Sequence, residues 1–313
     1  MTGLSKIKDY LPDRIVKLLE PIDDRYQIKE VRLRSDKPIL VDTDMGEFFV
    51  CASGGTFDIT KGESVFQNEI KRILDYVSRF SIYAFAEELK RGYITMTGGN
   101  RIGLCGRVVI EDDKIISLRN IASINIRIAN AMEGCADSFM DFLYKQEKIC
   151  NTLIISAPGC GKTTLLRDIL RNLSDGFHTH PGVNVGICDE RNEIAACSNG
   201  IPQNNVGVRT DVLDSCPKAS GMLMLLRSMN PTVIGIDEIG DEKDVDAIRY
   251  VMNCGCTIVG TVHGENIEEV MNKKQFKESG LIQEFERFIV LKMDKTPGLI
   301  EGIYDSEGEK IWA

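Results

Sequence analysis

The amino-acid sequence predicts a protein of two domains, in which a smaller α+β domain precedes an α/β domain built on a parallel sheet. Up to about residue 128, several short runs alternate apolar and polar residues, the pattern of strands with one buried face. From Thr152 onward, short runs that are apolar almost throughout alternate with helical segments, as in parallel strands covered on both faces. A length of 313 residues fits two domains of ordinary size, and 43% hydrophobic residues suffice to give each domain a core.

The N-terminal domain is predicted over residues 1–135. Its first 20 residues place apolar side chains at spacings near 3.6 and predict a helix, and residues 63–80 predict a second helix with a single apolar face. Strands with alternating burial are expected in most of the remainder, and residues 42–44 are expected to form the turn of one hairpin. These strands are expected at residues 30–34, 38–41, 46–50, 101–110, 114–118 and 124–128.

A linker and a larger domain follow. Residues 130–147 predict a helix with Phe139, Met140 and Leu143 among its apolar residues, and we assign residues 136–150 to a linker helix that acts as a hinge. The second domain then covers residues 151–313. Its parallel strands are expected at residues 153–155, 183–187, 233–236, 257–262 and 288–291. Ligands of such a sheet bind at the carboxyl ends of its strands.

The first strand of the second domain leads into a loop that suits a triphosphate. Residues 156–164 read Ser-Ala-Pro-Gly-Cys-Gly-Lys-Thr-Thr and precede a helical segment, which is the context of a phosphate-binding loop. Backbone N–H groups would surround the β-phosphate, Lys162 would bind β- and γ-phosphate oxygens, and Thr163 would bind Mg²⁺. The pattern asks for glycine at Ser156, where a left-handed backbone would cost about 1 kcal/mol. The expected nucleotide-binding residues are Pro158, Gly159, Cys160, Gly161, Lys162, Thr163 and Thr164.

Polar residues at three further strand ends complete the expected site. One strand ends in Asp237 and Glu238, so we expect Asp237 to hold Mg²⁺ through its water shell and Glu238 to take the proton of an attacking water. Glu190 follows another strand end and is an alternative base or a further contact to metal and water. His263 ends a third strand, where it is expected to sense the γ-phosphate.

The composition excludes several other functions. Ten cysteines include no C-x2-C pair, so no cysteine metal site is predicted. A net charge of −9 and only 7% aromatic residues argue against a nucleic-acid partner. The sequence has no apolar run of about 20 residues and no signal peptide, which predicts a soluble, cytoplasmic protein. Arg191 and Glu193 are expected to form a local ion pair, and His178 and His180 to lie on the surface.

The order of these motifs resembles the motors of type II secretion and type IV pili, a branch of the P-loop ATPases with a RecA-like domain. Walker A, the acidic box, Walker B and the histidine box of that branch match residues 156–164, 189–193, 233–238 and 260–263. Asp237 departs from the glycine that many of these motors have. Further segments resemble the stage III sporulation protein AA family, namely residues 30–34, 98–106, 188–195, 206–214, 216–219 and 227–231.

This resemblance implies a hexameric ATPase that binds ATP and Mg²⁺ in the cytoplasm of the mother cell of an endospore-forming bacterium. It also implies peripheral association with membrane proteins of the stage III A sporulation complex, which joins mother cell and forespore by a secretion-like channel. We expect a neighbouring subunit to supply an arginine for the transferring phosphoryl group. The candidates are Arg101, Arg107 and Arg127 in the first domain, with Arg209 and Arg227 as alternatives in the second.

Two other functions remain open at this point. RecA-like domains also translocate on DNA and RNA, which would make the protein a nucleic-acid translocating or remodelling ATPase. A third possibility is a nucleotide-gated scaffold that binds ATP but hardly hydrolyses it, and the serine at position 156 is the feature that favours it.

Overall fold

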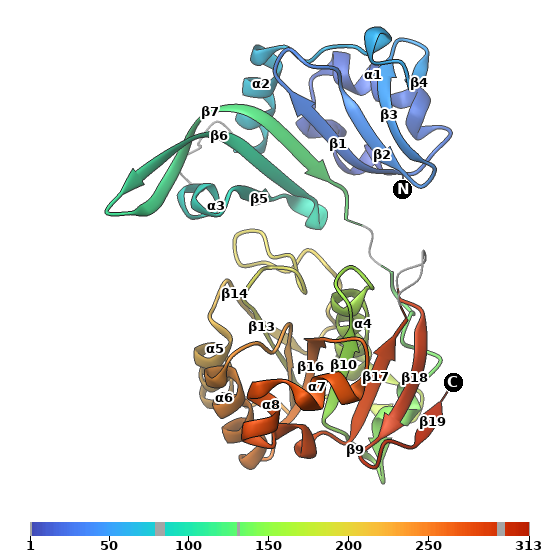
Figure 1. Cartoon of the computed structure of the whole chain (residues 1–313), viewed down its shortest axis with the longest axis vertical. Coiled ribbons are helices and arrows are strands. Elements are labelled where there is room, and N and C mark those ends of the chain that lie inside the picture. The colour runs from blue at the N-terminus through green and yellow to red at the C-terminus, as the bar shows by residue number, and fades with distance from the viewer. Residues whose placement is uncertain (1, 79–84, 130–131, 293–297, 313) are drawn as a thin grey trace. The chain divides into compact units, whose positions relative to one another are not determined.

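A computed structural model describes residues 2–78, 85–129, 132–292 and 298–312 of the chain (Figure 1). The chain divides into two compact units, Met1–Asn130 and Ala131–Ala313. The first unit contains an antiparallel sheet and the second a mostly parallel sheet, each with buried apolar clusters of its own. The expected fold class, an α+β domain followed by an α/β domain, is confirmed. Within the described ranges, no helix combines the length and the apolar content that a membrane span requires.

The first unit is built on a seven-stranded sheet in the order β4-β3-β2-β1-β7-β6-β5. Its core forms where the apolar faces of two helices pack on alternate residues of the strands. Ile15 and Ile70 of the helices and Val31 and Ile126 of the strands are fully buried there. The helices are α1 (Asp13–Asp23), α2 (Gln67–Val77) and α3 (Ala86–Arg91), with turns η1 (Leu4–Lys6), η2 (Lys8–Tyr10), η3 (Ile59–Lys61) and η5 (Thr97–Gly99). The strands are β1 (Ile28–Arg34), β2 (Leu40–Thr43), β3 (Gly46–Cys51), β4 (Gly54–Thr56), β5 (Tyr93–Thr95), β6 (Arg101–Glu111) and β7 (Lys114–Arg127).

The first helix begins later than the sequence predicts. Leu11 is extended, with φ −107° and ψ 145°, because the proline that follows it disfavours a helical backbone at the preceding residue. Residues 4–10 therefore form the two 3-10 turns η1 and η2, and α1 begins only after Pro12. The apolar residues expected on one helix face are nevertheless buried, since Ile7, Leu11 and Ile15 all belong to the core.

The second helix is also shorter than expected. Residues 64 and 65 form isolated β-bridges, so the helix begins at Gln67 rather than at residue 63. Phe66 precedes the helix and is exposed, although its position four residues before Ile70 fits the apolar face of the predicted helix. The expected last residues, 79 and 80, lie outside the described residues.

A single long hairpin replaces three expected strands of the first unit. Strand β7 runs continuously through residues 114–127, and its turn with β6 consists of Asp112 and Asp113. Both aspartates have a left-handed backbone, with φ of 48° and 58°, as a two-residue hairpin turn requires. The register shifts between Cys105 and Arg107, so the alternation along β6 is interrupted by a bulge.

The prediction of a linker helix over residues 136–150 is wrong. Within the described residues 132–150, the chain forms a 3-10 turn, η6 (Met140–Leu143), and a small hairpin of β8 (Tyr144–Lys145) and β9 (Lys148–Ile149). The hairpin turn consists of Gln146 and Glu147, whose left-handed backbone is incompatible with a continuing helix. Residues 130 and 131, where the helix was expected to begin, lie outside the described residues.

Tertiary packing explains the misleading spacing of apolar residues in this segment. Phe139, Met140 and Leu143 are fully buried, but they pack into a core of the second unit. Asp168 fixes the chain ahead of them, because its carboxylate accepts the N–H groups of residues 134 and 136 at 3.0 and 2.8 Å. The segment therefore belongs to the second unit, which argues against its being a separate hinge.

The second unit is built on an eight-stranded sheet in the order β14-β13-β15-β16-β10-β17-β18-β19. The strands from β14 to β17 pair in parallel, whereas β18 and β19 extend the sheet in antiparallel pairs and, like β14, were not expected. The strands are β10 (Thr152–Ser156), β13 (Val185–Asp189), β14 (Thr210–Asp214), β15 (Val233–Ile236), β16 (Thr257–His263), β17 (Arg287–Leu291), β18 (Ile300–Asp305) and β19 (Lys310–Trp312), with a separate hairpin of β11 (Gly176–Phe177) and β12 (His180–Pro181). The helices are α4 (Lys162–Asp175), α5 (Lys218–Ser228), α6 (Glu242–Asn253), α7 (Ile267–Asn272) and α8 (Lys274–Ser279), with the turn η7 (Leu281–Glu284).

Both faces of this sheet are covered, which accounts for the near-continuous apolar strands in the sequence. Along β10, Leu153 and Ile155 belong to a core with α5, α6 and α8, whereas Ile154 belongs to a core with α4 and η6. Because β10, β13, β15 and β16 run in the same direction, their carboxyl ends lie at one edge of the sheet. At that edge, Ser156 of β10 is in register with His263 of β16.

Candidate functional site

The loop between β10 and α4 has the backbone of a phosphate-binding loop. Gly159 and Gly161 have φ of 78° and 92°, left-handed values that residues with a Cβ rarely adopt. The N-terminus of α4 follows at once, so its free N–H groups face the loop. The glycines of the sequence motif are thus explained by the turn, and the helix end supplies a positive field for an anion.

Ser156 does not carry the backbone cost that a left-handed position would have imposed. It is the last residue of β10, is fully buried, and is not among the described residues with a positive φ. Its hydroxyl donates a hydrogen bond to the carbonyl of Ala157 at 2.9 Å. The serine therefore closes the strand without strain at the start of the loop.

Lys162 has all of its donors engaged by neighbouring protein atoms. Its ammonium donates to the carbonyl oxygens of Ser156 and Ala157, both at 3.0 Å, and lies 3.1 Å from Nδ1 of His263. Only 6% of the residue is exposed, and burial lowers the pKa of its ammonium, against the nearby charges of Asp237 and Glu238, which raise it. The lysine thus lies at the centre of the loop and faces two strand ends.

Glu238 follows β15 and contacts two other strand ends. One contact is with His263 at the end of β16, and the other is with Arg191 in the loop after β13. Oε1 of Glu238 lies 2.9 Å from Nε2 of His263, and its Oε2 forms an ion pair with Arg191. The backbone of Glu238 is left-handed, with φ of 55°. This backbone turn sends the carboxylate toward His263, and hence toward the loop that holds Lys162.

Asp237 and Thr163 provide an oxygen pair of the kind that Mg²⁺ prefers. Thr163 Oγ1 donates to Asp237 Oδ2 at 2.7 Å, and the hydroxyl of Thr261 donates to the other carboxylate oxygen. A magnesium ion in a nucleotide site is usually held by one or two protein oxygens together with phosphate oxygens and water. A hydroxyl and a carboxylate side by side beside the loop fit that requirement, although roles for Thr163 and Asp237 in metal binding stay a prediction.

Glu190 is held by a different partner. Its Oε2 accepts a hydrogen bond from Lys218 Nζ at 2.8 Å, and the same ammonium lies 3.6 Å from a carboxylate oxygen of Asp244. Burial by itself would lower the pKa of Lys218, but the hydrogen bond to Glu190 and the charge of Asp244 raise it. Glu190 is therefore tied to the start of α5, whereas Glu238 contacts the side chain that faces Lys162.

Asp189, the last residue of β13, organises the loop that follows it. Its carboxylate is buried and accepts the N–H groups of Glu193, Ile194 and Ala195 at 2.8 to 3.0 Å. Arg167 of α4 donates to carbonyls in the same loop, and burial lowers the pKa of its guanidinium. These contacts fix the acidic strand end against α4, so Asp189 has a structural role here.

The three arginines expected from the first domain lie on β6 and β7. Arg101 and Arg127 are directly opposite each other across the two strands. Arg127 Nε donates to Glu30 Oε2 at 3.2 Å, and the guanidinium of Arg101 lies 4.5 Å from the ring centroid of Tyr93. Arg107 is exposed beyond the register shift. Action of any of the three in a neighbouring subunit stays a prediction.

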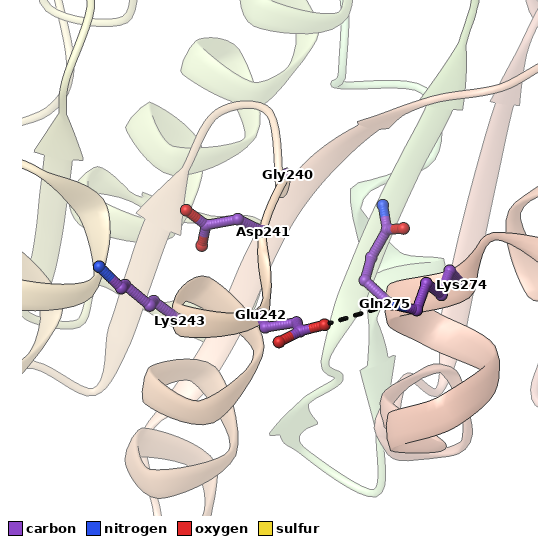
Figure 2. Close-up of a pocket in the computed structure, with 6 residues that line it drawn as sticks. All are labelled: Gly240, Asp241, Glu242, Lys243, Lys274 and Gln275. Carbon is purple, nitrogen blue, oxygen red and sulfur yellow. Dashed lines mark ion pairs between the residues drawn. The ribbon is translucent and has the colours of Figure 1, made fainter.

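A hollow of about 390 Å³ lies beside the loop that follows β15 (Figure 2). The lining residues are Gly240, Asp241, Glu242, Lys243, Lys274 and Gln275. Glu242 and Lys274 form an ion pair of 4.0 Å at the hollow, and both side chains are more than 70% exposed, so the pair adds little stability. No residue of the phosphate-binding loop lines this hollow, which is therefore separate from the candidate site.

Several residues of the site were missed by the sequence analysis. Arg191 was expected to pair locally with Glu193, but the ion pair that the structure resolves joins it to Glu238. Its position next to Glu190 at a strand end was a usable signal. Lys218 and Thr261 gave no such signal, because their roles depend on which strands and helices are neighbours. Of the two histidines expected on the surface, His178 is exposed, whereas His180 is partly buried and stacks on Tyr144.

Comparison with known proteins identifies similar sequences over nearly the whole chain. The family model described as "Sporulation stage III, protein AA" matches residues 3–311. Stage III sporulation protein AA of Bacillus subtilis is 39% identical over 310 residues, which cover 98% of this chain and 97% of that protein. The protein SEEDLING PLASTID DEVELOPMENT 1 of Arabidopsis thaliana is 29% identical over 164 residues, or 50% of this chain and 23% of that protein.

Solved structures with a similar fold are secretion and pilus ATPases. The ATPase DotB of Legionella pneumophila superposes with a TM-score of 0.54 at 15% identity, covering 84% of this chain and 72% of that one. The pilus retraction motor PilT with bound ADP superposes with a TM-score of 0.53 at 13% identity, covering 93% of this chain and 78% of that one. At these identities the likeness establishes the fold of a RecA-like secretion ATPase and leaves the chemistry to be argued from the site.

Proposed function

Because the chain belongs to the stage III sporulation protein AA family, we propose that it is an ATPase that powers or primes a secretion-like channel between mother cell and forespore. The reaction is the hydrolysis of ATP to ADP and phosphate. One observation carries this proposal: the loop lysine and two strand-end side chains form a connected group at one sheet edge, through the contacts of Lys162 with His263 and of His263 with Glu238. ADP bound to the pilus retraction motor of similar fold supports the choice of an adenine nucleotide.

In the proposed complex, the triphosphate lies along the loop at the start of α4. The N–H groups of residues 159–164 and the helix end hold the β-phosphate. Lys162 gives up a hydrogen bond to a carbonyl oxygen of Ser156 or Ala157 and donates to β- and γ-phosphate oxygens instead. Thr163 and Asp237 would hold Mg²⁺, which neutralises charge on the phosphates when bound. Positioning and electrostatic stabilisation supply most of the catalysis in this class of reaction.

Glu238 is the better supported base. Water attacks the γ-phosphorus in line with the leaving β-phosphate oxygen and loses its proton to a carboxylate within hydrogen-bond reach. Glu238 reaches the phosphate side of the site through His263, whereas Glu190 is held by Lys218 at the start of α5. His263 contacts both Lys162 and Glu238, so it can register whether the lysine has moved to a phosphate.

The proposal includes assembly into a ring, with six subunits as the expected number. An arginine from the neighbouring subunit would stabilise the transferring phosphoryl group, and Arg101, Arg107 and Arg127 are the candidates from the first unit. Membrane proteins of the stage III A sporulation complex are the expected partners, at the cytoplasmic face of the membrane in the mother cell. Nucleic acid is not expected to bind.

A weakly hydrolysing, nucleotide-gated scaffold is the second candidate, and one observation favours it. All three donors of Lys162 are engaged by protein atoms, so the lysine has to exchange at least one of these contacts before it can bind a phosphate. Single-turnover kinetics on the assembled ring distinguishes the two candidates. Cleavage of bound ATP before the nucleotide dissociates supports the motor, and dissociation of uncleaved ATP supports the scaffold.

The deciding experiment measures ATPase activity as a function of protein concentration, together with the mass of the particle at each concentration. If a neighbouring subunit completes the site, specific activity rises as the ring assembles, by about 10³ or more between subunit and ring. Activity independent of concentration would contradict the arginine in trans. Absence of ATP binding at any concentration, with magnesium present, would contradict the proposed function itself.

A further inference from the structure

Four side chains form a continuous chain of contacts across the candidate site. Arg191 pairs with one carboxylate oxygen of Glu238, the other oxygen lies 2.9 Å from Nε2 of His263, and Nδ1 of His263 lies 3.1 Å from the ammonium of Lys162. The four residues come from the loop after β13, the end of β15, the end of β16 and the start of α4. The chain of contacts therefore joins the ends of β13, β15 and β16 to the start of α4.

Donors and acceptors along this chain can be assigned from chemistry. A lysine ammonium has three donors and no acceptor, so Nδ1 of His263 accepts from Lys162. In a neutral imidazole the proton then resides on Nε2, which donates to Glu238. The remaining carboxylate oxygen takes the guanidinium of Arg191. Each oxygen of Glu238 thus has one protein partner, and the two contacts together fix the direction of the carboxylate.

We propose that Arg191 is a positioning residue that restrains Glu238, and that a magnesium nucleoside triphosphate has to overcome this restraint in order to bind productively. The inference rests on the proposed function, and it deepens that function by naming a regulatory contact of the same site. When Lys162 turns to the phosphates, His263 loses its donor and one end of the chain opens. The pair of Arg191 and Glu238 opposes this rearrangement, because it stabilises the arrangement in which the carboxylate is held between His263 and Arg191.

The size of the effect follows from solvent exposure. The Arg191 side chain is 63% exposed and that of Glu238 is 23% exposed, so the pair is partly screened. A restraint of this kind reduces the apparent affinity for nucleotide by the fraction of molecules in which it is broken. We expect about a three-fold reduction in affinity, a modest effect that is large enough for calorimetry.

The test is a double-mutant cycle on nucleotide affinity. The probe is the magnesium complex of adenylyl imidodiphosphate, a non-hydrolysable ATP analogue, and the four proteins are the parent chain, Arg191→Gln, Glu238→Gln and the double variant. Arg191→Gln is expected to bind the analogue about three-fold more tightly than the parent. In the Glu238→Gln background, the same substitution is expected to leave affinity unchanged or to weaken it, because only the general attraction of the guanidinium for phosphate is lost. Equal effects of Arg191→Gln in both backgrounds would overturn the proposal.

Two further variants separate the restraint from a loss of charge. Arg191→Lys keeps the positive charge beside Glu238 and is expected to return affinity to the parent value. Arg25→Gln removes an equivalent charge from an exposed arginine of the first unit and is expected to change nothing. Tighter binding by Arg25→Gln would contradict a role for the specific pair. So would Arg191→Lys if it tightened binding as much as Arg191→Gln does.

A second readout needs no nucleotide and keeps this inference distinct from the proposed function. The same four proteins are compared by thermal unfolding without ligand, where the pair of Arg191 and Glu238 should appear as a non-additive shift in melting temperature. Additive shifts would overturn the inference even if ATP binds and is hydrolysed. Conversely, if the parent chain binds no analogue, the proposed function fails, while a non-additive shift still supports the restraint.

Discussion

The ammonium of Lys162 lies 3.1 Å from Nδ1 of His263, so the phosphate-binding loop and the end of β16 are in direct contact. These residues are far apart in the sequence, and they meet because β10 and β16 are neighbouring parallel strands whose last residues are in register. The contact makes His263 part of the same site as the loop. It also gives the imidazole a partner whose position depends on nucleotide, which is the basis of the predictions on binding and turnover.

Lys162→Ala and Glu238→Gln should separate binding from turnover. Loss of the ammonium removes charge-assisted contacts to the phosphates, and nucleotide affinity should fall about ten- to hundred-fold. Loss of the carboxylate charge should leave affinity within a few-fold, while turnover falls by about 10² or more. Calorimetry and phosphate release measure the two quantities on the same preparations. Lys277→Ala, which removes an exposed lysine of α8, should change neither.

Thr163 should set the magnesium requirement. Its hydroxyl lies 2.7 Å from Asp237 Oδ2, so Thr163→Ala removes one of the two oxygens expected at the metal. The magnesium concentration that gives half-maximal nucleotide binding should rise about ten-fold, as expected for the loss of one ligand. Thr163→Ser retains the hydroxyl and should resemble the parent in a magnesium titration. An unchanged magnesium dependence in Thr163→Ala would show that the hydroxyl is not a ligand.

Asp189 should be required for stability. Its carboxylate accepts three backbone N–H groups while the residue is only 1% exposed, so Asp189→Ala leaves three backbone donors without acceptors, two of them buried. The free energy of unfolding of the second unit should fall by about 3 kcal/mol or more. Urea unfolding followed by the fluorescence of Trp312, the sole tryptophan, measures this unit. Asp246→Ala, at an exposed position of α6, should lie within about 0.5 kcal/mol of the parent.

The contribution of Glu69 to the first unit should depend on pH. Burial alone would raise the pKa of Glu69, but hydrogen bonds from Arg14 and from the N–H of Phe66 lower it below its ordinary value of 4.5. Because the folded pKa is lowered, the stabilisation by the ionised carboxylate is present above the unfolded pKa and is lost as pH falls through the folded pKa. Glu69→Gln should therefore cost about 1–2 kcal/mol near pH 7, and the cost should shrink as pH falls through the lowered folded pKa.

Circular dichroism during urea unfolding at several pH values measures the effect of Glu69→Gln, with Trp312 fluorescence reporting the second unit separately. Glu20→Gln, at an exposed position of α1, is the matched control and should show no comparable pH dependence. A cost of Glu69→Gln that does not decrease anywhere in the acid range would mean that the ionised carboxylate is not what stabilises α2.

The fold class and the group of strand-end residues could be predicted from the sequence because both depend on local patterns. Near-continuous apolar runs such as β10 identify strands covered on both faces, and parallel strands bring their carboxyl ends to one edge. The glycine pattern around Lys162 needs only the loop itself. These features follow from spacing within a few residues, so no tertiary contact had to be known.

Features that depend on tertiary packing could not be predicted in this way. Phe139, Met140 and Leu143 have helical spacing, but they are buried from a 3-10 turn whose position depends on contacts with α4. The pair of Arg191 and Glu238 joins two strand ends, and its partner choice depends on how the loop after β13 is folded around Asp189. In both cases the deciding contact lies far away in the sequence.

At Glu238 the main chain has an unfavourable left-handed conformation, while the side chain makes contacts that only a carboxylate can make. An L-residue with φ of 55° is disfavoured by about 1 kcal/mol relative to glycine. Glycine at position 238 would thus relieve the main chain while deleting the carboxylate that meets His263 and Arg191. A glutamate at this turn therefore carries a main-chain cost that glycine would not, in exchange for a carboxylate that contacts His263 and Arg191.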